Sequence, residues 1–79
     1  MRQVQLVGVI EADPQPGPGG TTTLPLAAMA QRFEVTVSGW HARWVPSIDP
    51  GTLVEVVGAL AAPGVVHALW VWPVVGLAD

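Results

Sequence analysis

The sequence contains no cysteine and no lysine, and charged residues of either sign are few. Without cysteine, the chain can form neither a disulfide framework nor a thiolate metal site. Its only basic residues are Arg2, Arg32 and Arg43, against six acidic residues, which gives a formal net charge of −3. This balance argues against a nucleic-acid binder that is driven mainly by positive charge.

Apolar residues make up 51% of the 79 residues and charged residues only 11%. This composition excludes intrinsic disorder, and the length allows one small domain with a thin core. We therefore expect residues 1–79 to form a single domain. Because so thin a core cannot take all the apolar side chains, we also expect the domain to associate with itself as a homodimer or higher oligomer.

The uncharged run from 56 to 78 is long enough to cross a bilayer. It is interrupted by Pro63-Gly64 and again by Pro73 and Gly76, and its valine and tryptophan residues favour strands. We therefore interpret it as two buried strands joined by a turn, and we expect no membrane association. The first residues carry no visible export signal, so the expected location is the cytoplasm.

Patterns typical of β-strands dominate the chain, and no segment has a convincing amphipathic helical pattern over 10 or more residues. The expected strands are Val4–Glu11, Phe33–Val37, Trp40–Val45, Leu53–Leu60 and Val65 to about Val75. The segment 21–30 can be read as loop or as strand. Turn signals lie at 49–51 and 63–64, whereas Gly8 and Gly58, inside strands, indicate bulges or sharp bends.

Five short strands with glycine bends predict an all-β protein. A sheet this small protects its edges best by curling closed. The strand number, the length and the bends fit a small, partly open Greek-key barrel of five strands, the OB-fold.

The order of these features resembles the superfamily of bacterial single-stranded-DNA-binding proteins and primosomal replication proteins. The segment Val4–Pro14 is similar to its opening strand, V-x-L-x-G-x-[LI]-x-x-D-P, and Phe33–Val37 to F-x-[LV]-x-V. Gly51–Leu60 resembles G-[ST]-x-[VI]-x-[VI]-x-G-x-[LI], and 66–72 stands where the closing strand would lie. The short spacing between the third and fourth strands, compared with full-length members, implies that the helix they carry there is absent. In this respect the chain is more similar to the primosomal replication proteins.

A second, weaker resemblance covers residues 39–74. Gly39-Trp40, Ala42-Arg43 and the segment 48–58 are similar to motifs of the soluble OB domain of NfeD-type partners of membrane proteases. Both resemblances imply the same fold.

The four tryptophans are the main candidates for function. In the expected strands, Trp40 and Trp44 share one face, with Arg43 on the other, and Trp70 and Trp72 also share a face. Stacking of a nucleic-acid base on an aromatic ring contributes about 1–3 kcal/mol and tolerates any sequence. A five-stranded barrel has little interior, so at least one pair is expected at the surface or at an interface. For each pair, packing in the core or at a dimer interface remains the alternative.

We therefore predict non-catalytic binding of single-stranded nucleic acid, DNA or RNA, as an accessory in DNA replication, recombination or repair. The expected binding residues are Trp40, Trp44, Trp70 and Trp72, which would stack bases, and Arg32 and Arg43, which would contact phosphate. The alternative is a protein-interaction OB module, either NfeD-like or used for oligomerisation, without nucleic acid. The net charge of −3 favours that alternative.

No pattern indicates catalysis, a metal or a cofactor. His41 and His67 lie far apart in sequence and have no cysteine to support them as zinc ligands. The acidic residues form no obvious pair, and the glycine-rich segment 14–20 lacks the Lys-Ser/Thr and the helix of a phosphate-binding loop. We expect no enzymatic activity, no metal, no cofactor and no small-molecule substrate.

Overall fold

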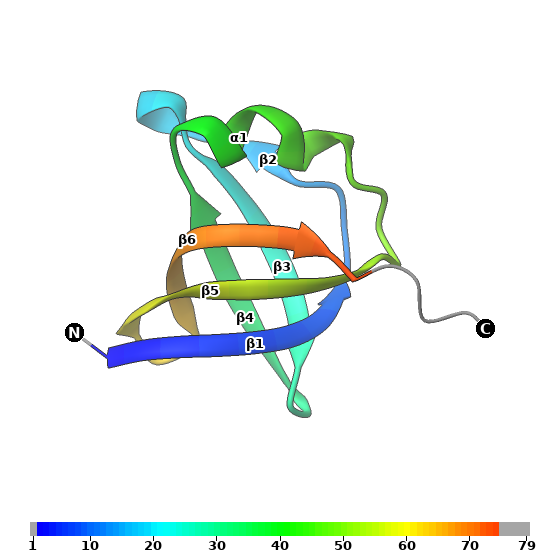
Figure 1. Ribbon diagram of the computed structural model, residues 1–79, viewed down its shortest axis with the longest axis vertical. Helices are drawn as coiled ribbons and strands as arrows, with labels where there is room; N and C mark the ends of the chain where they lie inside the picture. Colours follow the sequence, from blue (N-terminus) through cyan, green and yellow to red (C-terminus); the bar gives the residue numbers. More distant parts are fainter. Residues whose placement is uncertain (1, 75–79) are drawn as a thin grey trace.

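The computed structural model describes residues 2–74 of the chain. Five strands are seven to ten residues long, and they are accompanied by one two-residue strand and three helical turns near one end of the molecule (Figure 1). The elements are, in order, β1 (Arg2–Ile10), β2 (Gln15–Pro16), the 3-10 turn η1 (Pro18–Gly20), β3 (Thr22–Ala28), β4 (Gln31–Val37), α1 (Trp40–Trp44), the 3-10 turn η2 (Val45–Ser47), β5 (Leu53–Ala62) and β6 (Val65–Pro73).

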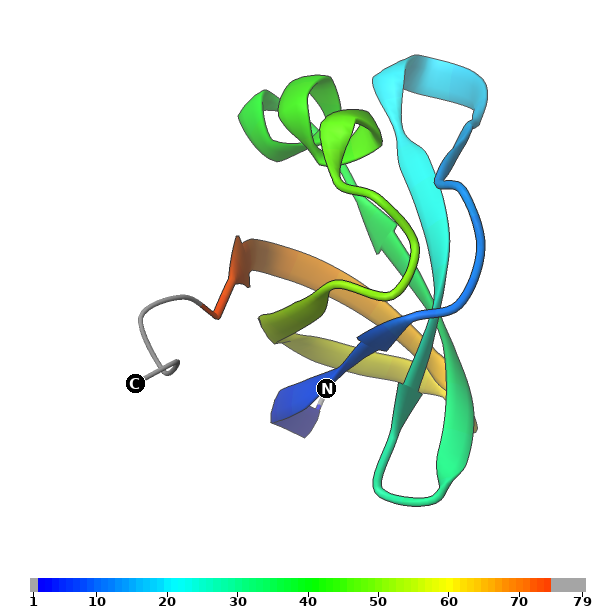
Figure 2. The same ribbon diagram turned by 90° about the vertical axis from the view of Figure 1, so that its right-hand side faces the viewer.

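The five long strands form a barrel in the order β1-β5-β6-β4-β3, which a short pairing of β1 with β3 closes. Strands β4 and β6 run parallel, and the other neighbours are antiparallel. β1 pairs with β5 along most of its length but with β3 only at Val9 and Ile10. Figure 2 shows how β3 and β4 cross the other three strands. The five-stranded barrel is therefore confirmed, and the ambiguous segment 21–30 supplies its second long strand.

The core lies inside the barrel, where alternate residues of all five long strands point inward. Most of these side chains are valine or leucine, and Thr22 is the single polar residue among the buried ones of the described chain. The side chains that are fully enclosed are Ile10, Leu24, Leu26, Val35, Val37, Val45, Val54, Val56, Val66 and Val71. This alternation leaves every second residue of each strand on the outside, where a ligand could reach the side chains.

The strand predicted over 40–45 is wrong, because these residues form α1 and the first residue of η2. The expected absence of a helix between the third and fourth long strands is wrong for the same reason. Strand β4 already pairs with β3 on one edge and with β6 on the other. A hairpin partner at 40–45 would therefore find no free edge, and Gly39, with φ 64°, turns the chain away from the sheet instead.

The remaining strand predictions agree with the structure to within two residues at the ends that it describes. β1 begins at Arg2 rather than Val4, and β5 continues to Ala62 rather than Leu60. The predicted end of the last strand, near Val75, lies outside the described residues. Within residues 2–74, no helix has the length and apolar character needed to cross a membrane.

Two glycines allow the strands to approach one another closely enough to close the barrel. A Cβ at Gly8 would lie 2.3 Å from the carbonyl oxygen of Ala27 in β3. A Cβ at Gly58 would lie 2.3 Å from the carbonyl oxygen of His67 in β6. Both obstacles are backbone atoms, which cannot move without disturbing the sheet. The two glycines that the sequence marked as bends are therefore required by close packing of backbones.

We expect Gly58→Ala to destabilise the protein by about 1–3 kcal/mol, because the added methyl group would overlap the backbone of β6. Gly17→Ala is the matched control. Gly17 has an ordinary φ of −127°, and its added Cβ would meet mainly the hydroxyl of Thr21, a side-chain atom that can move at the cost of its exposed hydrogen bond to the carbonyl oxygen of Pro18. Urea unfolding followed by circular dichroism measures both changes. Equal stability of the two variants would contradict the close approach at Gly58.

Candidate nucleic-acid interface

A β-bulge in β6 changes the direction in which the end of this strand points its side chains. Val57 in β5 pairs with Trp70, but the next residue, Gly58, pairs with Ala68. Leu69 is therefore an extra residue without a partner, and its side chain is 75% exposed. A bulge of this kind shifts the alternation of a strand by one residue.

The bulge places two tryptophans on the outside of the barrel. In a regular strand, Trp70 and Trp72 would share the inward face of Val66 and Ala68, both of which are buried. After the bulge, Val71 points into the core instead, and both tryptophan side chains lie outside. The pair shares one face, as the sequence predicted, and that face is exposed.

The helix α1 carries the other two tryptophans to the same side of the barrel. Trp40 and Trp44 are four residues apart and so lie on one side of the helix. The helix is anchored by Thr22 of β3, whose buried hydroxyl donates a hydrogen bond to the carbonyl oxygen of Ala42 at 3.0 Å. Ala42 is itself buried against the barrel, which fixes the rotation of the helix about its axis.

Five rings from α1 and β6 form one continuous group, which we call the aromatic cluster. Trp70 and Trp72 stack with their ring centroids 5.5 Å apart and an interplanar angle of 25°. Trp44 meets Trp72 edge-on at 5.4 Å and lies 6.1 Å from Trp40. The ring of His41 is 4.9 Å from that of Trp40 and 5.7 Å from that of Trp70. The cluster brings together all four tryptophans that the sequence singled out.

Three rings of the aromatic cluster are open to solvent and two lie beneath them. Trp40 is 64% exposed, Trp70 43% and Trp72 45%. Trp44 is half-buried and packs against the core. Within the described chain, the indole nitrogen Nε1 of Trp44 and the nitrogen Nδ1 of His41 are buried without a hydrogen-bond partner. A ligand can therefore reach the rings of Trp40, Trp70 and Trp72, which Trp44 and His41 support from below.

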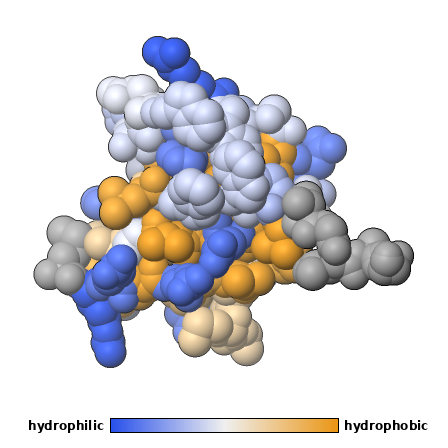
Figure 3. Space-filling model, in the orientation of Figure 1, coloured by the Kyte–Doolittle hydropathy of each residue, from blue (hydrophilic) through white to orange (hydrophobic). Residues whose placement is uncertain are grey.

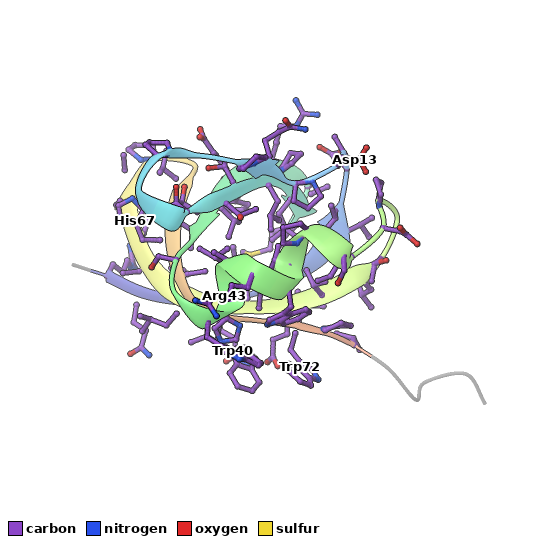
Figure 4. All side chains as sticks on the ribbon, turned by 90° about the horizontal axis from the view of Figure 1, so that it is seen from above. Asp13, Trp40, Arg43, His67 and Trp72 are labelled. Atoms are coloured by element: carbon purple, nitrogen blue, oxygen red, sulfur yellow. The ribbon has the colours of Figure 1, made fainter. Side chains whose placement is uncertain are left out.

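Charge is distributed unevenly around the aromatic cluster. Arg43 projects from α1 near Trp40, as Figure 4 shows from above. Arg32 lies at the start of β4, at the end of the barrel opposite α1, where its Nε donates a hydrogen bond to a carboxylate oxygen of Glu11 at 2.7 Å. On the β5 side, Glu55 accepts a hydrogen bond from the amide of Gln5. The structure thus brings Arg43 to the tryptophans and separates Arg32 from them.

Two participants in this site were not found from the sequence. In the strand expected over 40–45, His41 would lie on the face opposite Trp40, because alternation separates neighbours, whereas the helix turns both rings to one side. The alternation expected in the last strand gives no sign that Leu69 is an extra residue. The glycine at 58 was a signal for a bulge, but it did not show which residue of the opposite strand would be the extra one.

No group of three or more histidine or acidic side chains within residues 2–74 is placed to hold a metal ion. The site consists of aromatic surface with one cation at its border. Its chemistry is that of stacking, with no nucleophile or paired acid and base among the five rings.

Comparisons with known proteins identify the fold of this chain as that of a small OB-fold barrel. No protein-family model matches the sequence, and neither does any curated protein. Among solved structures, the wild-type single-stranded DNA binding protein from Thermus aquaticus matches 100% of this chain and 43% of its own, with a TM-score of 0.77 and 29% identity. The protein PriB from Ralstonia solanacearum matches 94% of this chain and 99% of its own, with a TM-score of 0.65 and 24% identity.

A third match belongs to a much larger protein. The tRNA agmatidine synthetase TiaS, in complex with its tRNA, AMPCPP and agmatine, matches 94% of this chain with a TM-score of 0.82 and 16% identity. The chain spans 19% of TiaS and less than half of the Thermus protein, but nearly all of PriB. These matches confirm the OB-fold, and the Thermus protein confirms the resemblance to single-stranded-DNA-binding proteins that the motifs indicated. PriB agrees with this chain in fold.

We expect Thr22→Val to destabilise the protein by about 1–3 kcal/mol, because it leaves the buried carbonyl of Ala42 without its donor. It should also loosen α1 and weaken the near-ultraviolet circular dichroism of the tryptophans. Thr22→Ser is the matched control, since it keeps the hydroxyl and loses only a methyl group. An unchanged tryptophan signal in Thr22→Val would show that this bond does not hold the helix in place.

Proposed function

We propose that this protein binds single-stranded nucleic acid, DNA in the first place, by stacking bases on the aromatic cluster and without catalysing a reaction. The observation that carries the proposal is the group of three exposed tryptophans on one side of an OB-fold barrel. The structural likeness to the single-stranded DNA binding protein from Thermus aquaticus supports it.

Stacking on three rings provides enough free energy for useful affinity. At about 1–3 kcal/mol per base, Trp40, Trp70 and Trp72 together contribute about 3–9 kcal/mol before the cost of ordering the strand. The upper part of that range corresponds to dissociation constants in the micromolar region. Trp44, which is half-buried, contributes mainly by holding the rings of Trp40 and Trp72 in position.

Among residues 2–74, Arg43 is the cation that lies near the aromatic cluster and gives binding its electrostatic support. Arg32, whose guanidinium is already paired with Glu11, lies at the end of the barrel opposite α1, away from the tryptophans. Binding of this type depends weakly on salt, because few counterions are released. It also tolerates any base sequence, which suits an accessory of DNA replication, recombination or repair in the cytoplasm.

Titration with an unlabelled 30-mer oligothymidine tests the proposal. We expect saturable quenching of tryptophan fluorescence, since the three exposed indoles lie where bases would stack. The logarithm of the binding constant should fall with the logarithm of salt concentration with a slope near −0.7, as one phosphate contact on a single strand gives. A fluorescence signal that does not change at tens of micromolar protein would contradict the proposed function.

Three variants, two of them a matched pair of arginine substitutions, locate the interface. Trp40→Ala should weaken binding by about 1–3 kcal/mol, because it removes the most exposed ring. Arg43→Gln should weaken binding by up to about 1 kcal/mol and reduce the salt slope, whereas Arg32→Gln, with the same change of charge, should do neither. Equal effects of the two arginine variants would show that only the net charge of the protein matters.

The outer face of β1 and β5 favours self-association as a second function of the same barrel. Val7 is 52% exposed there, and Val9 and Leu53 pair in register and are also exposed. Figure 3 shows this apolar area, interrupted by a polar band, below the paler side chains that lie over β6 and α1. We propose that this face is covered in a homodimer or higher oligomer.

Analytical ultracentrifugation tests this self-association. The wild-type protein should sediment as an oligomer at micromolar concentrations. Val7→Glu should shift it to the monomer, because it would bury a second carboxylate beside Glu55, the register partner of Val7, in the interface. Gln15→Glu, in β2 across the barrel, is the control of equal charge and should leave the oligomer intact. A wild-type protein that remains monomeric at high concentration would disprove the assembly.

A further inference from the structure

A groove of about 680 Å³ lies between the loop that contains η1 and the helix α1. Trp40 and Arg43 line it from α1, and Gly19, Gly20 and Thr21 line it from the loop. Trp40 also contacts the other rings of the aromatic cluster, so the groove begins where the cluster ends. The two surfaces therefore form one continuous path across this end of the barrel, and Figure 4 shows Trp40 and Arg43 side by side on it.

The charges along this path favour an anion in the groove over one on the opposite side of the cluster. None of the residues that line the groove is acidic, and Arg43 is the one charged residue among them. On the other side, Glu55 of β5 is the register partner of Trp72 and carries a carboxylate. A negatively charged nucleic-acid strand that lies on the tryptophans would thus be repelled from β5 and attracted towards α1.

The loop wall of the groove is almost free of side chains. Gly19 and Gly20 have φ values of 69° and 75°, which favour glycine, and a Cβ at either position would meet no atom within 4 Å. The space beside the loop is therefore open, and a ligand can approach the main chain directly. This side of the groove, formed mainly by the main chain of the loop, can accommodate an extended chain of irregular shape, such as a phosphodiester backbone.

We propose that this groove holds the phosphodiester backbone of the same single strand whose bases stack on the aromatic cluster. The strand runs from Trp72 and Trp70 over Trp40 and continues into the groove beside Arg43. This inference rests on the proposed function and adds to it a second contact surface. It makes affinity depend on the length of the strand, because a short oligonucleotide can occupy the cluster without reaching the groove.

Two adjacent residues of β2 provide a test, because they point to opposite sides of that strand. Pro16 lines the groove, whereas Gln15 lines a separate hollow next to Pro25 and Phe33. Pro16→Glu and Gln15→Glu add the same charge to the protein, one inside the groove and one outside it. Pro16→Gln controls for the loss of proline without adding a charge.

The variants are titrated with oligothymidines of 4 and 16 nucleotides, about the limits of site size known for one OB-fold. Pro16→Glu should weaken binding of the 16-mer about fivefold and leave binding of the 4-mer within about twofold, since only the longer strand meets the added carboxylate. Gln15→Glu and Pro16→Gln should bind both oligonucleotides as the wild type does.

The outcomes separate this inference from the function on which it rests. If Pro16→Glu and Gln15→Glu weaken the 16-mer equally, or if Pro16→Glu weakens both lengths by the same factor, the groove does not hold the strand. In that case the stacking function still stands. If the wild-type protein binds neither oligonucleotide, the proposed function fails and the groove proposal fails with it.

Discussion

The extra residue at Leu69 is the feature on which the exposed site depends. Without it, Trp70 and Trp72 would continue the inward face of β6, where the barrel has no room for two indoles. The bulge is compatible with close packing only because Gly58, its neighbour on β5, has no side chain to meet the backbone of β6. One glycine and one unpaired leucine thus convert two core positions into an exposed aromatic surface.

Barrel closure determines the other half of the site. Since β4 is paired on both edges, the chain that leaves it cannot add another strand and folds into α1 at the end of the barrel. The hydrogen bond from Thr22 to Ala42 then fixes the helix so that its rings meet those of β6. The barrel topology therefore brings two segments that are distant in sequence together in the aromatic cluster. Trp44 and Trp70, the nearest in sequence of the tryptophans from the two segments, are 26 residues apart.

The strands could be predicted where alternation continues over several residues, as in 33–37 and 53–60, and where a glycine-containing turn ends the pattern. The five residues of α1 were too few for a period of two to be told from one of 3.6. The tryptophans at 40 and 44 nevertheless share a side in either conformation, so that part of the site was predicted for the wrong reason. The loss of Arg32 from the site could not be foreseen, because its pairing with Glu11 depends on β1 and β4 meeting at that end of the barrel.

A net charge of −3 describes the whole chain, but a bound strand is affected mainly by the charges within about 10 Å, the screening length at 0.1 M salt. Near Trp40 the local balance is set by Arg43 and by a groove lined without acidic residues. The rings hold one another at centroid distances of 4.9–6.1 Å, so the proposed stacking of a base on them would cost little side-chain freedom. The same contacts leave no gap for a base between two rings, which restricts stacking to their outer faces. A preorganised aromatic surface can in this way replace much of the positive charge that nucleic-acid binders usually carry.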